Sequence, residues 1–210
     1  MCAQQRPIRP LSCEEAIEFV EISRQNILEN GTILSVTGTI YNNDKIILPL
    51  HITLSRNDTI ITAEITIGDR TQEYIIDNNN HDIASNILEI NDQFILSPYD
   101  IANLFMSQHQ LQYIGTNHIS GRPVYEFLSK QQYPNTTSIA NIKISIDTKF
   151  HIPLKVEYIN SKYRTIRRIM ISSFKKNDDI WMPKTITLSD FSKNKKTTIN
   201  IDGYNCFMAN

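Results

Sequence analysis

Apolar residues recur first at a helical period and then, for most of the chain, at every second position. Near the N-terminus, Ser12 and Glu15 form a capping-box pattern that begins a helix, and Asn30-Gly31 forms a pattern that ends one. Between these signals, apolar residues recur mostly at spacings of three and four. We therefore predict an amphipathic helix over residues 13–29.

The alternating segments predict antiparallel strands joined by tight turns. In residues 46–55, for example, Leu50, Ile52 and Leu54 share one face, and the polar turn Arg56-Asn57-Asp58 follows. Such segments are typical of a meander, in which each strand pairs with the next. The predicted strands are 32–41, 46–55, 59–67 and 71–77 in the first half, and 111–119, 122–130, 140–147, 153–159, 163–174, 184–191 and 195–202 in the second.

The segment between the two meanders breaks the alternation. Residues 83–96 fit either a short helix or an irregular crossing. Ser97-Pro98-Tyr99-Asp100 then has the composition of a helix start, with a serine cap and a proline at the first helical position. We predict a second helix over residues 98–107. Residues 1–11 are expected to form a flexible leader and residues 12–210 a single domain.

The predicted sheet has more apolar surface than the predicted helices can cover. About eleven strands with one apolar face expose more apolar area than two short helices cover, so the sheet must close, curl or leave a cleft. The pattern leaves two architectures open. One is a curled sheet with an apolar hollow that suits acyl chains, and the other is a fully packed barrel or sandwich.

Charge and hydropathy exclude several function classes. The chain has 21 Lys and Arg against 22 Asp and Glu, so no global positive field draws it to nucleic acid or anionic lipid. Its apolar runs, such as residues 46–50, are far shorter than the roughly 20 residues of a membrane helix. The first residues do not form a signal peptide. We expect either a cytosolic protein or a chain whose signal has been removed.

Residues that could carry catalysis or bind a metal lack the spacing of known sites. The histidines do not form a metal-binding pair: they are His51, His81, His109, His118 and His151. We therefore predict a non-enzymatic protein without metal or cofactor. One basic cluster occurs, at Arg164, Arg167 and Arg168. Because Arg164 and Arg168 share one face of the predicted strand and Arg167 lies on the other, we interpret the cluster as a solvated sheet face rather than an anion site.

The cysteines leave two questions open. Cys13 and Cys206 lie near opposite ends of the chain and could form a disulfide or stay free thiols. Cys2 precedes a polar segment, residues 3–7, like the tether of a mature bacterial lipoprotein. Cys2 could therefore be an acylated lipid anchor, or it could be an ordinary cysteine of a frayed terminus, since no attachment signal precedes it.

The C-terminal half carries motifs of a known family. Residues 144–158 resemble the strand–Asp–turn–Pro–strand stretch of bacterial outer-membrane lipoprotein-sorting proteins, the LolA/LolB/RseB-like superfamily. Residues 180–190, in which a Trp-x-Pro enters a strand, resemble its next element. Residues 195–201 resemble its closing strand and residues 121–125 its mid-chain hairpin. The resemblance covers residues 110–202 in motif and the whole chain in layout.

This resemblance implies a mainly β (α+β) fold, a strongly curved antiparallel half-barrel of about eleven strands with helices covering the concave apolar face. In the superfamily, the cavity holds lipoprotein acyl chains or related lipids, and one branch senses envelope stress. The implied function is a lipid- or lipoprotein-binding carrier or chaperone in the periplasm or at the outer membrane, with its signal peptide removed. The alternative is an envelope sensor or protein-interaction module on the same fold, with other envelope proteins as partners.

We expect the apolar sheet face and the apolar sides of both helices to line this hollow and to contact lipid or acyl chains. The expected lining residues are Ile17, Val20, Ile27, Leu50, Ile52, Leu54, Ile61, Ile65, Ile101, Leu104, Phe105, Ile144, Leu154 and Val156.

Overall fold

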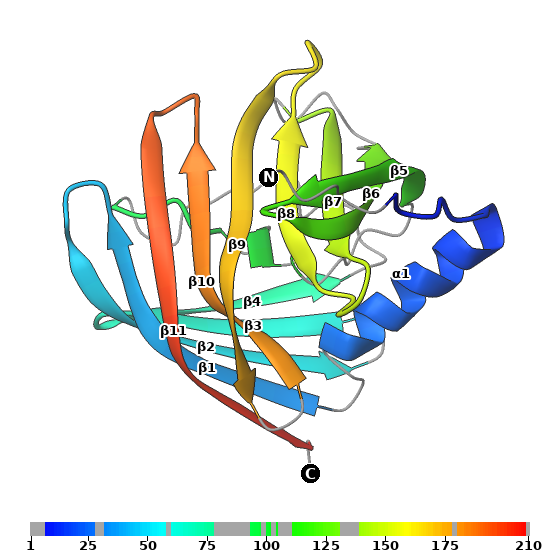
Figure 1. Ribbon diagram of the computed structural model, residues 1–210. Coiled ribbons are helices and arrows are strands. Elements are labelled where there is room, and N and C mark those ends of the chain that lie inside the picture. The colour runs from blue at the N-terminus through cyan, green and yellow to red at the C-terminus, as the bar shows by residue number, and fades with distance from the viewer. Residues whose placement is uncertain are drawn as a thin grey trace, which may run out of the picture.

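The computed structural model describes residues 7–27, 32–57, 60–77, 93–97, 100–101, 104, 111–130, 139–177 and 180–208. These residues form the helix α1 (Cys13–Ile27) and one antiparallel sheet of eleven strands (Figure 1). The strands are β1 (Thr32–Asn42), β2 (Ile47–Asn57), β3 (Ile60–Ile67), β4 (Arg70–Asp77), β5 (Gln112–Ile119), β6 (Arg122–Lys130), β7 (Asn141–Asp147), β8 (Pro153–Ile159), β9 (Thr165–Asn177), β10 (Ile180–Asp190) and β11 (Lys195–Met208).

Two meanders build the sheet. Its strand order is β4-β3-β2-β1-β11-β10-β9-β8-β7-β6-β5, so β1 and β11 join the meanders in the middle and β4 and β5 form the edges. In Figure 1, β9, β10 and the upper part of β11 stand upright whereas β2, β3 and β4 run across the view, which shows how strongly the sheet curves. The predicted open, curved antiparallel sheet of about eleven strands is confirmed.

The seam between β1 and β11 contains a bulge that requires a glycine. Thr37 pairs with Gly203 and Gly38 with Ile201, so the register shifts between Thr37 and Gly38. A Cβ atom at Gly38 would lie 2.1 Å from the backbone oxygen of Asn200, closer than any side chain allows. Bulges bend a strand and increase its twist. The glycine therefore permits the bend by which the two meanders share one curved sheet.

The apolar faces lie as the alternation predicts. On β3, Ile61, Ala63 and Ile65 are buried while Glu64 between them is exposed. The same buried face continues across the sheet into the second meander, where Phe127, Ile142 and Tyr158 are fully buried, and it forms one large core cluster. Burial of one face only is typical of an antiparallel sheet.

Strand ends differ from the prediction where a long-range partner determines them. β10 begins at Ile180 rather than 184, because residues 180–183 pair with the end of β9 and a register shift accommodates Pro183. β11 continues to Met208 rather than 202, because residues 203–208 pair with the first half of β1. Neither extension has the regular alternation that marks a strand in sequence.

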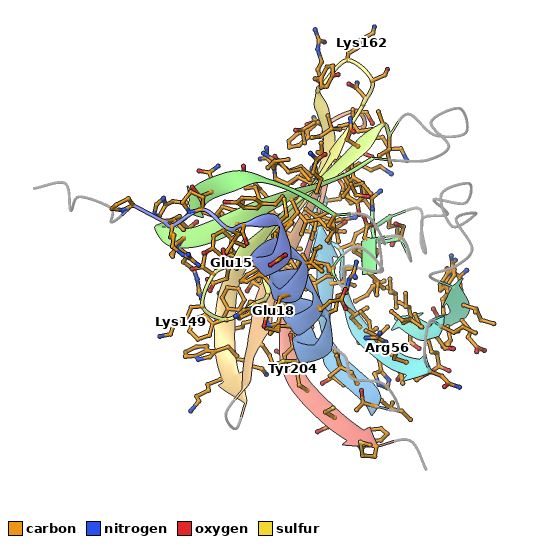
Figure 2. The ribbon with its side chains drawn as sticks, turned by 90° about the vertical axis from the view of Figure 1, so that its right-hand side faces the viewer. Glu15, Glu18, Arg56, Lys149, Lys162 and Tyr204 are labelled. Carbon is orange, nitrogen blue, oxygen red and sulfur yellow. The ribbon has the colours of Figure 1, made fainter. Side chains whose placement is uncertain are left out.

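The predicted capping box of α1 is present. The Ser12 amide donates to Glu15 Oε2 at 2.8 Å, and the Glu15 amide donates to Ser12 Oγ at 3.2 Å. The helix packs on the second meander through the Phe19 ring, whose centroid lies 4.9 Å from that of Tyr125 and 6.1 Å from that of Phe127. Figure 2 views the molecule from the side on which α1 lies.

A cover of several helices on the concave face is not confirmed. Of the second predicted helix, Asp100, Ile101 and Leu104 have helical backbone, and its other residues lie outside the described part of the chain. Residues 83–92 of the crossing segment also lie outside the described part. Within the described ranges, α1 is the one extended helix.

Candidate functional site: an apolar cavity on the concave face

The sheet encloses an apolar cavity of about 400 Å³ where its two meanders meet. Its floor consists of apolar side chains from β1, β2, β9, β10 and β11: Leu34, Val36, Ile52, Leu54, Ile171, Ile186, Leu188, Ile199 and Ile201. Ligand pockets commonly measure about 300–1,000 Å³. At about 30 Å³ for a group the size of water or a methylene, the cavity holds roughly a dozen such groups.

Part of the crossing segment covers the cavity. Leu96, Ile101 and Leu104 line it from the side opposite the floor. Ser97 and Asp100 form a second capping box here, since the Ser97 amide and hydroxyl donate to Asp100 Oδ2 and the Asp100 amide donates to Ser97 Oγ. The predicted cap at Ser97 and Asp100 is thus present, and it turns the chain so that Ile101 faces the cavity.

A buried polar network fixes this cover to the sheet. Asp100, which is 1% exposed, pairs with the guanidinium of Arg167 from β9 and accepts a hydrogen bond of 2.8 Å from the Tyr158 hydroxyl of β8. Arg167 also donates to the carbonyl of Ile95. Although burial disfavours the charge on Arg167, Asp100, Tyr158 and Asp190 together outweigh it and raise the pKa of the guanidinium above its ordinary value. Two strands therefore hold the segment that carries Leu96 and Ile101.

The interpretation of the arginine cluster as a solvated face is wrong for Arg167. Arg167 does lie on the opposite face from Arg168, as its position in the strand predicts, but that face is the buried one. Arg168 lies on the other face and donates to Glu157, and Arg164 is exposed. Alternation places Arg167 in phase with the buried Ile169 and Ile171, but the local sequence does not indicate its partner, Asp100, which lies 67 residues away.

The turn between β7 and β8 forms one side of the cavity mouth. Asp147 Oδ1 accepts hydrogen bonds from the amides of Lys149 and Phe150, and Asp147 Oδ2 accepts one from Arg122. Asp147 therefore caps the turn of the strand–Asp–turn–Pro–strand stretch. Phe150 and Lys149 line the cavity, and the Phe150 ring lies 5.6 Å from that of Trp181 at the start of β10.

The same turn contacts α1 through His151. The His151 ring lies 4.4 Å from the Phe19 ring, and its Nδ1 atom is buried without a hydrogen-bond partner among the described residues. Burial lowers the pKa of His151, and the Phe19 backbone and the Asp147 carboxylate offset this only in part. A neutral His151 therefore joins α1 to the wall of the cavity.

The expected lining residues that the structure describes fall into three groups. Ile52, Leu54, Ile101 and Leu104 line the cavity. Val20, Leu50, Ile61, Ile65, Ile144, Leu154 and Val156 are buried but outside its lining, and Leu154 belongs to a separate small cluster. Ile17 is 66% exposed, because it lies on the outer side of α1. The side chain of Ile27, and Phe105 and Cys2 entirely, lie outside the described residues.

Several lining residues did not figure in the sequence prediction. Alternation in residues 184–191 and 195–202 could have indicated Ile186, Leu188, Ile199 and Ile201, because these strands were predicted correctly over those residues. The mouth residues, among them Trp181 and Tyr204, lie in the strand extensions that alternation does not mark.

Within the described ranges, no group of three or more His, Cys, Asp or Glu could hold a metal ion. Cys13 and Cys206, whose pairing the sequence left open, are free and exposed. Among the same residues, α1 included, no helix combines the length and apolarity needed to cross a membrane. The chemistry that the cavity itself offers is apolar contact, with a few polar groups at its mouth.

Residues 95–207 match the model of a family described as "-like: Uncharacterized protein". This match spans more than half of the chain. The chain belongs to this family. The matched residues include the cover, β5 to β10 and nearly all of β11, and so most of the cavity. No curated protein matches the chain significantly in sequence.

Three solved structures illustrate the fold that this chain shares. A Vibrio parahaemolyticus domain, provisionally named an outer membrane lipoprotein-sorting protein domain, matches with a TM-score of 0.69 at 10% identity over 93% of each chain. A DUF1329 family protein from Desulfovibrio piger matches with a TM-score of 0.68 at 12% identity, over 91% of this chain and 92% of that one.

A LolA superfamily protein from Nitrosomonas europaea matches with a TM-score of 0.56 at 9% identity, over 90% of this chain and 92% of that one. These matches span nearly the whole of each chain, so the similarity extends to the complete sheet. The predicted resemblance to the LolA-like superfamily is confirmed for the fold.

Proposed function

We propose that this protein is a non-enzymatic carrier that holds an acyl chain in the cavity between its two meanders, within the bacterial cell envelope. The observation that carries the proposal is the 400 Å³ apolar cavity at the centre of the sheet. The LolA-like fold supports it, because one protein of that fold is named for lipoprotein sorting. A carrier needs a site that excludes water and performs no chemistry, and the floor of this cavity carries apolar side chains.

The size of the cavity is sufficient for useful affinity. Burial of a methylene group contributes about 0.8 kcal/mol, so roughly a dozen methylenes contribute about 10 kcal/mol before the cost of immobilising the chain. A dissociation constant of about 1 μM corresponds to about 8 kcal/mol. Association costs at least about 4 kcal/mol, so an acyl chain that fills the cavity can bind with a dissociation constant of about 40 μM or weaker, which permits release.

The decisive experiment fills the cavity without breaking the fold. Ile52 lines the floor, so Ile52→Phe places extra carbon atoms in empty space, whereas Ile47 of the same strand is exposed. We expect Ile52→Phe to keep the thermal stability of the wild type and to weaken binding of a fluorescent acyl probe at least about tenfold, since about two methylenes lose their place. Ile47→Phe should bind the probe as the wild type does.

Equal probe binding by the wild type and by Ile52→Phe would refute the cavity as the acyl site. Native mass spectrometry of the purified protein gives an independent result, because co-purified acyl species appear as added mass. A wild type that binds no acyl probe and carries no added mass would refute the carrier function.

The second candidate is an envelope sensor or protein-interaction module. It is favoured by the two open sheet edges, because Ile75 on the edge strand β4 and Ile114 on the edge strand β5 are exposed apolar residues. Open edges can add a strand from a partner. Ile75→Lys would abolish such binding at β4 and leave acyl binding unchanged, which separates the two functions.

The envelope location and the lipid anchor at Cys2 are part of the proposal. An acylated Cys2 would hold the carrier at a membrane surface. Fractionation of cells that express the wild type or Cys2→Ser tests this, with metabolic labelling by a palmitate analogue as the direct readout. Equal labelling and equal membrane association of both proteins would refute the anchor.

A further inference from the structure

The cavity mouth carries charge of one sign. Among the described residues that line the cavity, Lys149 is the one with a charged side chain at neutral pH. Tyr204 also lines the cavity, but its hydroxyl donates to the Pro183 carbonyl, and burial raises the pKa of that hydroxyl further above the neutral range. An occupant of the cavity therefore meets apolar walls and one cation.

The ammonium of Lys149 has no carboxylate partner among the described residues. The nearest acid in sequence, Asp147, already has other partners. Its buried carboxylate pairs with Arg122 at 2.8 Å and accepts hydrogen bonds from the two turn amides. Lys149 Nζ lies 5.2 Å from the centre of the Phe150 ring, in the range of a cation–π contact. The cation is thus available to a ligand.

The turn holds Lys149 at the boundary between cavity and solvent. Phe150 next to it lines the cavity and packs on Trp181, which is 39% exposed and marks the open side. Lys149 itself is exposed, and in Figure 2 its side chain lies at the left margin of the sheet, far from Lys162 at the tip of the β8–β9 turn. A lysine stem can lie along an apolar wall while its ammonium stays in water.

We propose that the cavity selects single-chain amphiphiles with an anionic head group, a carboxylate or a phosphate monoester, and that Lys149 pairs with this head. The inference rests on the proposed acyl-carrier function and adds the head group to it. A volume of about 400 Å³ suits one chain of roughly a dozen carbons and leaves no space for a second. The head of such a chain then lies at the mouth, where the one cation stands.

The selectivity is moderate in size. An ion pair at an exposed site stabilises a complex by about 0.2–1 kcal/mol, which corresponds to a preference of up to about fivefold. A ligand with a neutral head group leaves Lys149 hydrated and therefore binds without this gain in affinity. Screening weakens the pair as salt rises, because the Debye length falls from about 10 Å at 0.1 M to about 3 Å at 1 M.

The experiment compares ligands of one chain length on three proteins. Dodecanol, dodecanoate and dodecyl phosphate displace a neutral fluorescent probe from the wild type, from Lys149→Gln and from the control Lys162→Gln. Both lysines are exposed turn residues, so neither variant should lose stability. We expect the wild type and Lys162→Gln to bind an anionic ligand about three- to fivefold more tightly than dodecanol, and Lys149→Gln to show no preference.

Each outcome decides the inference. Loss of preference for dodecanoate alone assigns a carboxylate head, and loss for dodecyl phosphate alone assigns a phosphate head. Equal binding of dodecanol and both anions by the wild type, or a preference that survives Lys149→Gln, overturns the head-group inference while the carrier function stands. Failure of all three ligands to bind the wild type overturns both. A preference that persists unchanged at high salt also contradicts pairing at Lys149.

Discussion

Removal of the Arg167 guanidinium tests how the cover of the cavity is held. In Arg167→Met, an unbranched apolar side chain replaces the arginine, and the Asp100 carboxylate keeps the hydroxyl of Tyr158 and the donors of Ser97 but loses its cation. Breaking a buried ion pair on one side costs about 3–5 kcal/mol, because a charge stays buried without compensation. In a chain of this size, 1 kcal/mol corresponds to about 2–4 °C, so Tm should fall by roughly 6–20 °C.

Urea unfolding followed by circular dichroism measures this loss, and Arg168→Met is the matched control. Arg168 is the next residue and also pairs with a carboxylate, that of Glu157, but the Arg168 side chain is 37% exposed. Glu157 also keeps Lys143 and Lys155 as partners after the change. We therefore expect Arg168→Met to cost about 1 kcal/mol or less.

The double variant Arg167→Met with Asp100→Asn should lose less stability than the two single variants lose in sum. With both charges removed, no buried charge remains, and the amide oxygen of Asn can still accept from Tyr158. Additive losses, or an Arg167→Met variant no less stable than Arg168→Met, would refute the buried pair as the attachment of the cover.

Three further predictions concern the seam, the His151 contact and the thiols. Gly38→Ala should lower the free energy of unfolding in urea by more than about 1–3 kcal/mol, the usual cost of overpacking, because the alanine Cβ would clash with the Asn200 backbone. Unchanged stability would contradict this close approach. Because burial lowers the pKa of His151, this imidazole binds a proton more readily in the unfolded chain, and the stability of the fold should decrease as the pH falls below the ordinary value of 6.5. His151→Asn should therefore make stability depend less on pH between about pH 7.5 and about pH 5.5. An unchanged dependence would assign it to other groups. Cys13 and Cys206 should both react with a thiol reagent in the folded, unreduced protein, and protection of either, mapped by mass spectrometry, would contradict their exposure.

The sequence predicted most strands because local rules decide them. Alternation identifies the buried face of β3 from Ile61 and Ile65, and the capping residues Ser12 and Ser97 mark where helical backbone begins. These signals depend on neighbours within a few residues. The same signals fail for residues 203–208 of β11, whose strand geometry exists because β1 lies beside them.

The site was harder to predict because it joins residues that are distant in sequence. Alternation indicates that Ile52 and Ile65 share a face, but both are equally apolar, and only the assembled sheet places Ile52 at the cavity and Ile65 in the packed core. Arg167 shows the same limit for charge. Its partner comes from the crossing segment, and nothing between the two residues indicates that they meet.

The position of the cavity follows from what fills the rest of the concave face. Near β6, the Phe19 ring of α1 packs on Tyr125 and Phe127 and fills the space that the second meander leaves. Phe94 and Ile95 are completely buried in the same core cluster as the sheet. The remaining concave surface, at the seam of β1 and β11, faces Leu96 and Ile101 across the cavity. Since the cover and the floor both line the cavity, a larger side chain at Ile101 in the cover should shorten the chain that fits, as Ile52→Phe does in the floor.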